Sequence, residues 1–201
     1  MGEEKNSGRT PGSDPVDTRF WQSAHTFEWV QPKVAGSFVL MSEGRELGTM
    51  AQPSRLRSVW HGESAFGRWE FRAAGMWSRR SEVSDLSSGH LRASYLMRWH
   101  AAEGILTLPD GRSFSWHQKS WIGGTCLFLD TNDRVVLEVR RGRLGGGRRF
   151  SDLFRTQGTI SKNPGTLEPL TLGLLVFVAW FLIIVQNEET AAVAATTAAV
   201  G

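Results

Sequence analysis

Residues 170–185 read LTLGLLVFVAWFLIIV, a run that carries no charged side chain and is apolar on every side of a helix. A helix that is hydrophobic all round has to be buried, either in a lipid bilayer or inside a protein core. The chain before it, residues 26–141, consists of short alternating segments rich in aromatic and β-branched residues, which is typical of β-strands. The fold therefore depends on whether those strands stand beside a membrane anchor or surround this helix.

The strand-rich region is organised by a repeat of about 22 residues. Gly44, Gly67, Gly89 and Gly111 are spaced 23, 22 and 22 positions apart, and Asp133 follows after a further 22. A repeat of this length holds two strands and two turns, the dimension of a β-meander. We predict turns at 42–45, 66–68, 87–90, 109–112 and 131–134. The residue after each marker is basic: Arg45, Arg68, His90, Arg112 and Arg134.

Five such repeats predict roughly ten strands between residues 38 and 141. A first strand at 26–31 and a further strand within 148–155 bring the expected total to about twelve. A twisted antiparallel sheet of that size curls and closes, because open edges invite aggregation. The predicted fold class is mainly β: a closed antiparallel barrel of about 12 strands around a buried hydrophobic C-terminal α-helix. The lumen of so wide a barrel needs a filling element, and the only unallocated apolar segment is the run at 170–185.

The apolar run fits two placements. Residues 169–187 carry no charge, and a membrane-spanning helix needs about 20 predominantly apolar residues. Against a span, Trp180 lies inside the run, no Lys or Arg flanks it closely, and the residues after it are acidic. A helix over 170–185 is about 24 Å long, comparable with the height of tilted strands. We expect burial in the barrel; the alternative is a tail-anchored single-pass membrane protein, with helix 169–187 in the bilayer and a cytoplasmic β domain.

The length of 201 residues suits one domain. We expect a disordered leader at 1–24, a single barrel domain at 25–186 with its helix at about 169–186, and a low-complexity tail at 187–201. The first twenty residues contain no apolar stretch of the kind found in a secretory signal. Cys126 is the only cysteine, which excludes an intrachain disulfide and favours a reducing compartment. The expected location is cytoplasmic, with or without membrane association.

Three segments resemble the tubby C-terminal-like superfamily, which includes the tubby domains, the LURP-one-related proteins and the phospholipid scramblases. They are GRWEFRAAGMWSRRSEVSD at 67–85, GILTLPDGRSFSW at 104–116 and LGLLVFVAWFLIIV at 172–185. The resemblance, to an uncharacterised bacterial-type member, implies a barrel with the helix threaded through it and phosphoinositide or phospholipid binding. It implies no site residue, because no lipid-binding residue of the family aligns here. The chain lacks the cysteine cluster and proline-rich leader associated with scramblases, so lipid flipping is not expected.

No catalytic, cofactor or metal motif is present, and we expect a non-enzymatic protein without a cofactor. The nearest approach is GESAFG at 62–67, where Phe66 replaces the glycine that a nucleophile elbow needs after Ser64, so Ser64 is interpreted as a turn residue. Cys126 alternates with the apolar face of a strand. A reaction would require candidate side chains to converge in space, and we expect no cleft in which two of them meet. The candidates are His61, His100, His117, Cys126 and Asp130.

Nine tryptophans invite a sugar-stacking or base-stacking interpretation. Trp77, Trp99 and Trp121, however, recur with the structural repeat, each in the loop at the opposite end of the hairpin from the glycine turn. That regularity favours a scaffold role, in which the rings pack at the rim of the barrel.

The strongest indication of function is the segment RRGRLGGGRR at 140–149. Arginines on a glycine-rich loop can follow an anionic headgroup layer. The simpler alternative is a solvated loop in an arginine-rich protein. We expect a binding module for an anionic phospholipid surface or a protein partner, and no nucleic-acid partner. The candidate lipid-binding residues are Arg140, Arg141, Arg143, Arg148 and Arg149.

Overall fold

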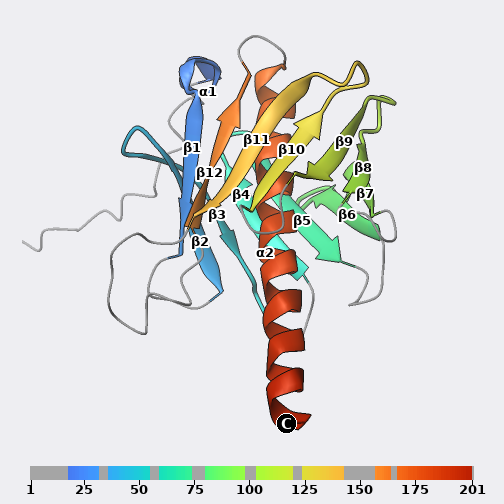
Figure 1. The fold of residues 1–201 in the computed structure, drawn as a ribbon. Coiled ribbons are helices and arrows are strands. Elements are labelled where there is room, and N and C mark those ends of the chain that lie inside the picture. The colour runs from blue at the N-terminus through green and yellow to red at the C-terminus, as the bar shows by residue number, and fades with distance from the viewer. Residues whose placement is uncertain are drawn as a thin grey trace, which may run out of the picture.

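The computed structural model describes residues 18–31, 36–54, 59–73, 80–97, 103–119, 124–142, 157–163 and 167–200. Twelve strands lie between two helices (Figure 1). The helices are α1 (Thr18–Ser23) and α2 (Pro169–Val200). The strands are β1 (Thr26–Val30), β2 (Ser37–Ser42), β3 (Arg45–Ala51), β4 (Val59–Ser64), β5 (Gly67–Ala73), β6 (Arg80–Asp85), β7 (Leu91–Met97), β8 (Glu103–Thr107), β9 (Ser113–Gln118), β10 (Thr125–Leu129), β11 (Val135–Gly142) and β12 (Gln157–Lys162).

The twelve strands form one closed antiparallel barrel, which confirms the predicted fold class. Each strand pairs with its neighbours in sequence, and β1 closes the barrel by pairing with β12, with Thr26 opposite Ser161 and Val30 opposite Gln157. The strand side chains alternate between inside and outside, as in β2, where every second residue is buried. Closure leaves no unpaired edge, so the backbone hydrogen-bonding groups of every strand are used within the chain.

The two ends of the barrel differ. At one end, here called the turn rim, short turns join β2 to β3, β4 to β5, β6 to β7, β8 to β9 and β10 to β11, and all five predicted turns are confirmed. In the β2–β3 and β8–β9 turns, Gly44 (φ 76°) and Gly111 (φ 87°) supply left-handed backbone without steric cost. The other end, here called the exit rim, holds the far ends of the same strands, from Val30 of β1 round to Gln157 of β12.

Helix α2 runs through the lumen from the turn rim to the exit rim (Figure 1). Residues 171–184 are all buried. Aromatic rings hold the helix to the wall: Phe177 meets Trp69 at 5.0 Å, and Phe181 meets Phe71 at 5.2 Å between ring centroids. The window Pro169–Gln186 has the length and mean hydropathy, 2.3, of a membrane span, but 78% of it is buried inside the protein. The barrel thus accounts for the apolar run.

Glycines in the barrel wall leave space for the ring of Phe177 on α2. A Cβ on Gly62 would lie 2.8 Å from Phe71 and 2.9 Å from Phe177, and a Cβ on Gly48 would lie 2.8 Å from Phe177. Such distances are shorter than real side chains adopt, so these positions accept only hydrogen if the rings stay in place. The helix and the wall are therefore matched in shape at Phe177.

The predicted leader at 1–24 is wrong over its last residues. Thr18–Ser23 form α1, and Trp21 is buried against Phe27 (5.1 Å) and Phe66 (5.0 Å). The Lys162 ammonium also donates to the backbone carbonyls of Trp21 (2.9 Å) and Gln22. Burial of an aromatic ring over the open end of the lumen offsets the entropy of ordering this short helix, which composition alone did not indicate.

Two further boundaries differ from expectation. Helix α2 continues past its predicted end near residue 186 to Val200, because the alanine-rich segment 190–200 has high helix propensity. The barrel also has its last strand at 157–162, and the predicted segment 148–155 lies outside the described residues. Trp77, Trp99 and Trp121 lie outside them as well, so the scaffold interpretation of these rings stays a prediction.

Truncation tests the role of the central helix. A chain that ends at Pro169 should lose cooperative thermal unfolding, because it leaves the ring-lined lumen open to water. A chain that ends at Gln186 is the control and should keep it, because the buried part of α2 is retained. Differential scanning calorimetry measures both; a cooperative transition in the shorter chain would contradict this account of the core.

The shape match at Phe177 gives a second prediction. Gly62→Ala should lower the free energy of unfolding by about 1–3 kcal/mol, since overpacking a filled core forces side chains off their rotamers. The double variant Gly62→Ala/Phe177→Leu should be less destabilised than the sum of the single variants, because the smaller side chain makes room for the new methyl group. Urea unfolding of the four proteins in the cycle measures this coupling, and strictly additive effects would contradict it.

Candidate functional site

Of the predicted arginine cluster, only Arg140 and Arg141 are described, and they lie in β11 near the exit rim. Arg140 is exposed near the end of β11, and its Nε donates to Glu138 at 2.6 Å. Arg141 belongs to the same strand. Arg143, Arg148 and Arg149 lie outside the described residues. The structure therefore places the start of this cluster at the end of the barrel from which α2 leaves.

The residues singled out for possible chemistry lie apart. His61 pairs with Glu70 on the outer wall at 3.7 Å, and His117 pairs with Glu103 at 3.2 Å. Cys126 is fully buried. Asp130 lies in the β10–β11 turn, and His100 is outside the described residues.

Cys126 and Ser64 have the surroundings of structural residues. Beside Cys126, burial raises the pKa of the Tyr95 hydroxyl and keeps it neutral. The Ser64 hydroxyl accepts a hydrogen bond from the backbone N–H of Phe66 at 3.0 Å, as a turn serine does. Within the described part of the chain, no group of three or more His, Cys, Asp or Glu side chains could hold a metal ion.

The turn rim is ordered by three aspartate–arginine pairs, one on each of three successive hairpins. Asp85 pairs with Arg92 at 3.1 Å, and Asp110 pairs with Arg112 at 2.7 Å. Asp130 pairs with Arg134 at 2.7 Å. Each aspartate lies in its turn or at the start of it and also accepts backbone N–H groups of that turn, so the same carboxylate closes the loop and holds the guanidinium.

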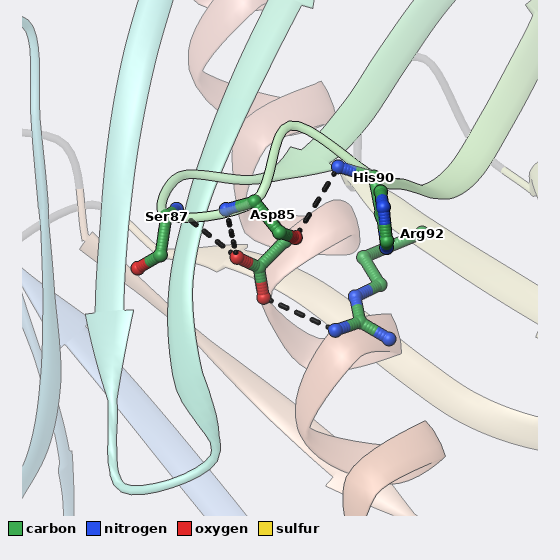
Figure 2. A network of polar contacts seen from close by, with 5 residues as sticks. Asp85, Ser87, His90 and Arg92 are labelled. Carbon is green, nitrogen blue, oxygen red and sulfur yellow. Dashed lines mark hydrogen bonds and ion pairs between the residues drawn. The ribbon is translucent and has the colours of Figure 1, made fainter.

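The β6–β7 turn shows this arrangement in detail (Figure 2). One carboxylate oxygen of Asp85 accepts the backbone N–H groups of Ser87 (3.0 Å) and Ser88 (2.9 Å), while the other accepts Nη2 of Arg92 (3.1 Å). These bonds favour the ionised form. The Ser88 backbone bond and then the Arg92 side chain hold the pKa of Asp85 at about 2. The pKa values of Asp110 and Asp130 are lowered as well, chiefly by hydrogen bonds from Arg112 and Arg134.

A pocket of about 340 Å³ opens between these turns and the first turn of α2. Its apolar lining includes Phe66, Trp69, Leu108, Leu170 and Leu174. Its polar lining is Asp85, Arg92, Asp110, Arg112 and Thr171. Nη2 of Arg112 donates to Thr171 at 3.2 Å and so connects the β8–β9 turn to the helix. The pocket combines an apolar surface with two oriented guanidinium groups.

A second hollow, of about 290 Å³, lies on the outer wall of β5 and β6. Its charged residues are Glu70, Arg72, Glu82 and Asp85. Arg72 pairs with Glu70 at 2.7 Å and lies opposite Glu82 in the register of the two strands. This hollow carries three carboxylates and one guanidinium on a solvated sheet surface and has no apolar side for a ligand besides Leu86, so the pocket at the turn rim is the better candidate site.

Sequence reasoning did not predict the pocket. The basic residue after each repeat marker was visible, and Arg112 is one of them, but Arg92 and the three aspartates were not connected with it. An aspartate in or just before the turn and an arginine two to seven residues later, repeated on three hairpins, is the pattern that predicts the three pairs. It does not predict that two of them meet at the start of α2.

The bonds around Asp85 make a prediction about pH. The folded-state pKa of about 2 lies below the ordinary Asp value of about 3.9, so this group stabilises the fold above about pH 4. That contribution is lost as the pH falls from about 4 towards about 2. A carboxyl ¹³C NMR titration should give a midpoint near 2 for Asp85. The variant Arg92→Gln should raise the midpoint only partway, since the Ser88 bond remains; an ordinary midpoint in the wild type would contradict the arrangement.

Comparison with known proteins supports the fold. No protein-family model and no curated protein match the chain. Among solved structures, the X-ray structure of a protein from Arabidopsis thaliana matches with a TM-score of 0.53 and 16% sequence identity, over 89% of this chain and 99% of that one. At this identity the likeness concerns the fold alone. It supports the barrel fold described above.

Proposed function

We propose that this chain is a non-enzymatic member of the tubby C-terminal-like superfamily that docks on an anionic phospholipid surface through its exit rim. The observation that carries the proposal is the position of Arg140 and Arg141, at the end of β11 and at the rim from which α2 leaves the barrel. Side chains at the end of a closed barrel can meet a flat surface together, whereas side chains on its wall cannot. The domain would act in the cytoplasm at the membrane surface.

The described residues at the exit rim fit such a surface. Arg80 begins β6, Lys119 follows β9, and Arg140 lies exposed two residues before the end of β11. Val30 and Leu96, at the ends of β1 and β7, are among the exposed large apolar side chains. Bases mixed with exposed apolar groups are the combination that binds anionic bilayer surfaces.

The charge of the connecting segments also supports the proposal. Six segments outside the described residues join strand ends of the exit rim: 32–35, 55–58, 74–79, 98–102, 120–123 and 143–156. Asp152 is the only acidic residue in their sequences. Their bases are Lys33, Arg55, Arg57, Arg79, Arg98, Arg143, Arg148, Arg149 and Arg155. Among the described residues, arginines at the turn rim pair with aspartates, and Arg80 and Arg140 at the exit rim pair with Glu82 and Glu138.

The test is co-sedimentation of the full chain with neutral vesicles and with vesicles that contain anionic lipid. Binding should be stronger to the anionic vesicles and should weaken with salt, because each base near such a surface contributes about 1 kcal/mol. Replacement of Arg140, Arg141, Arg143, Arg148 and Arg149 together by Gln should abolish the preference. Equal binding of the variant and the wild type, or binding by neither, would overturn the proposal. The remaining hypothesis would then be that the exit rim binds a protein partner.

Two controls sharpen this experiment. Replacing Arg19, Arg45, Arg68 and Arg134 by Gln lowers the net charge at the turn rim and should leave the vesicle preference intact. Alkaline carbonate extraction of the full chain separates surface docking from membrane insertion, because a docked chain is released into the supernatant. If the full chain instead stays with the membrane pellet, the helix acts as an anchor.

A further inference from the structure

We propose that the pocket at the turn rim binds a single small amphiphile with an anionic oxygen head group, of the fatty-acid carboxylate class, and an apolar chain. The pocket lies at the opposite end of the barrel from the exit rim, so this proposal stands apart from the proposed vesicle docking. Its volume of about 340 Å³ falls within the range of small-molecule sites. Both parts of the ligand have a counterpart in its lining.

The head group is recognised by Arg92 and Arg112. Contacts among the described residues use Nη2 of Arg92, and Nε and Nη2 of Arg112. A guanidinium has five N–H donors in a fixed fork, so Nη1 of each arginine has donors to spare for a carboxylate. The two side chains are 47% and 44% exposed, which leaves them open to a ligand.

Asp85 and Asp110 line the pocket as ionised groups, so their charges oppose an anion while their hydrogen bonds hold the two guanidinium groups in place. Asp85 accepts two backbone N–H groups and Arg92, and Asp110 accepts the backbone N–H and the side chain of Arg112. Their low pKa values keep them ionised, so the guanidinium groups stay in place at neutral pH. The pocket therefore presents oriented donors.

The apolar chain is recognised by the rings and leucines of the lining. Trp69 and Leu174 form part of the buried core, while Leu170 is 54% exposed at the first turn of α2. An exposed leucine beside a Trp and a Phe is a surface that gains from being covered. The positive end of the α2 dipole adds to the attraction for an anion, and Glu168, whose charge acts on Arg112, opposes it. The match to one head and one chain distinguishes this class from a bare anion.

Calorimetric titration of the full chain with decanoate below its micellar concentration tests the proposal. Decanoate should bind. Acetate lacks the apolar chain, decanol lacks the charge, and decyltrimethylammonium carries the opposite charge. Each of these three should bind at least about tenfold more weakly than decanoate. A decanoate dissociation constant weaker than about 1 mM, or equal binding of decanol, would overturn it. Acetate binding as strong as decanoate would reduce the site to an anion site and overturn the amphiphile class.

Matched variants locate the site. Arg92→Gln and Arg112→Gln should each weaken decanoate binding about tenfold or more, because each removes a charge-assisted contact. Arg134→Gln breaks the equivalent pair on the next hairpin, outside the pocket, and should leave binding unchanged. Leu170→Ser should weaken binding, while Leu96→Ser, at a leucine of similar exposure on the exit rim, should not. An equal loss in the control variants would overturn the assignment.

Two further outcomes keep the proposals separable. The variant in which Gln replaces Arg140, Arg141, Arg143, Arg148 and Arg149 should bind decanoate like the wild type, whether or not vesicle docking is confirmed. If an arginine variant fails to fold, as its melting curve would show, the Leu170→Ser and Leu96→Ser pair and the ligand series on the wild type still decide the question.

Discussion

The burial of an uncharged helix inside the barrel is the constraint on which the rest of this structure depends. Twelve strands close around a lumen too wide for their own side chains to fill, and residues 171–184 of α2 fill it completely with apolar groups. The dependence is mutual, because the helix would otherwise expose its whole surface to water. The glycines opposite Phe177 show how closely wall and helix are matched.

This arrangement makes the two ends of the barrel chemically different. At the turn rim the connections are short, and carboxylates in or beside the turns pair with arginines of the same hairpins. Trp21 and Phe66 cover the lumen there, and α2 begins beside them. At the exit rim the helix leaves the barrel, and the segments between the strands are long and rich in bases. Both proposals follow from this difference between the two ends: the vesicle-docking proposal concerns the charged surface at the exit rim, and the ligand proposal concerns the pocket at the turn rim.

The chemistry of the described residues favours binding over catalysis. The histidines pair singly with glutamates on the outer wall, and the cysteine is sealed in the core. The groups with the most perturbed pKa on the surface are aspartates, and turn bonds explain their shifts. A reaction would need an acid, a base or a nucleophile that converge on one substrate atom. The arginines at the turn rim supply hydrogen-bond donors, which suits recognition of an anion.

The sequence by itself determined the strand count, the turns, the closure of the sheet and the apolar helix, because the repeat of about 22 residues and the uncharged run are local patterns. It also indicated the basic residue in each turn. Only the tertiary structure decided that the helix lies in the lumen, since length and hydropathy are the same for a core helix and a membrane span. The pocket likewise needed the folded chain: Arg92, Arg112 and Leu170 are far apart in sequence, and they meet because closure of the barrel fixes which turns face the start of α2.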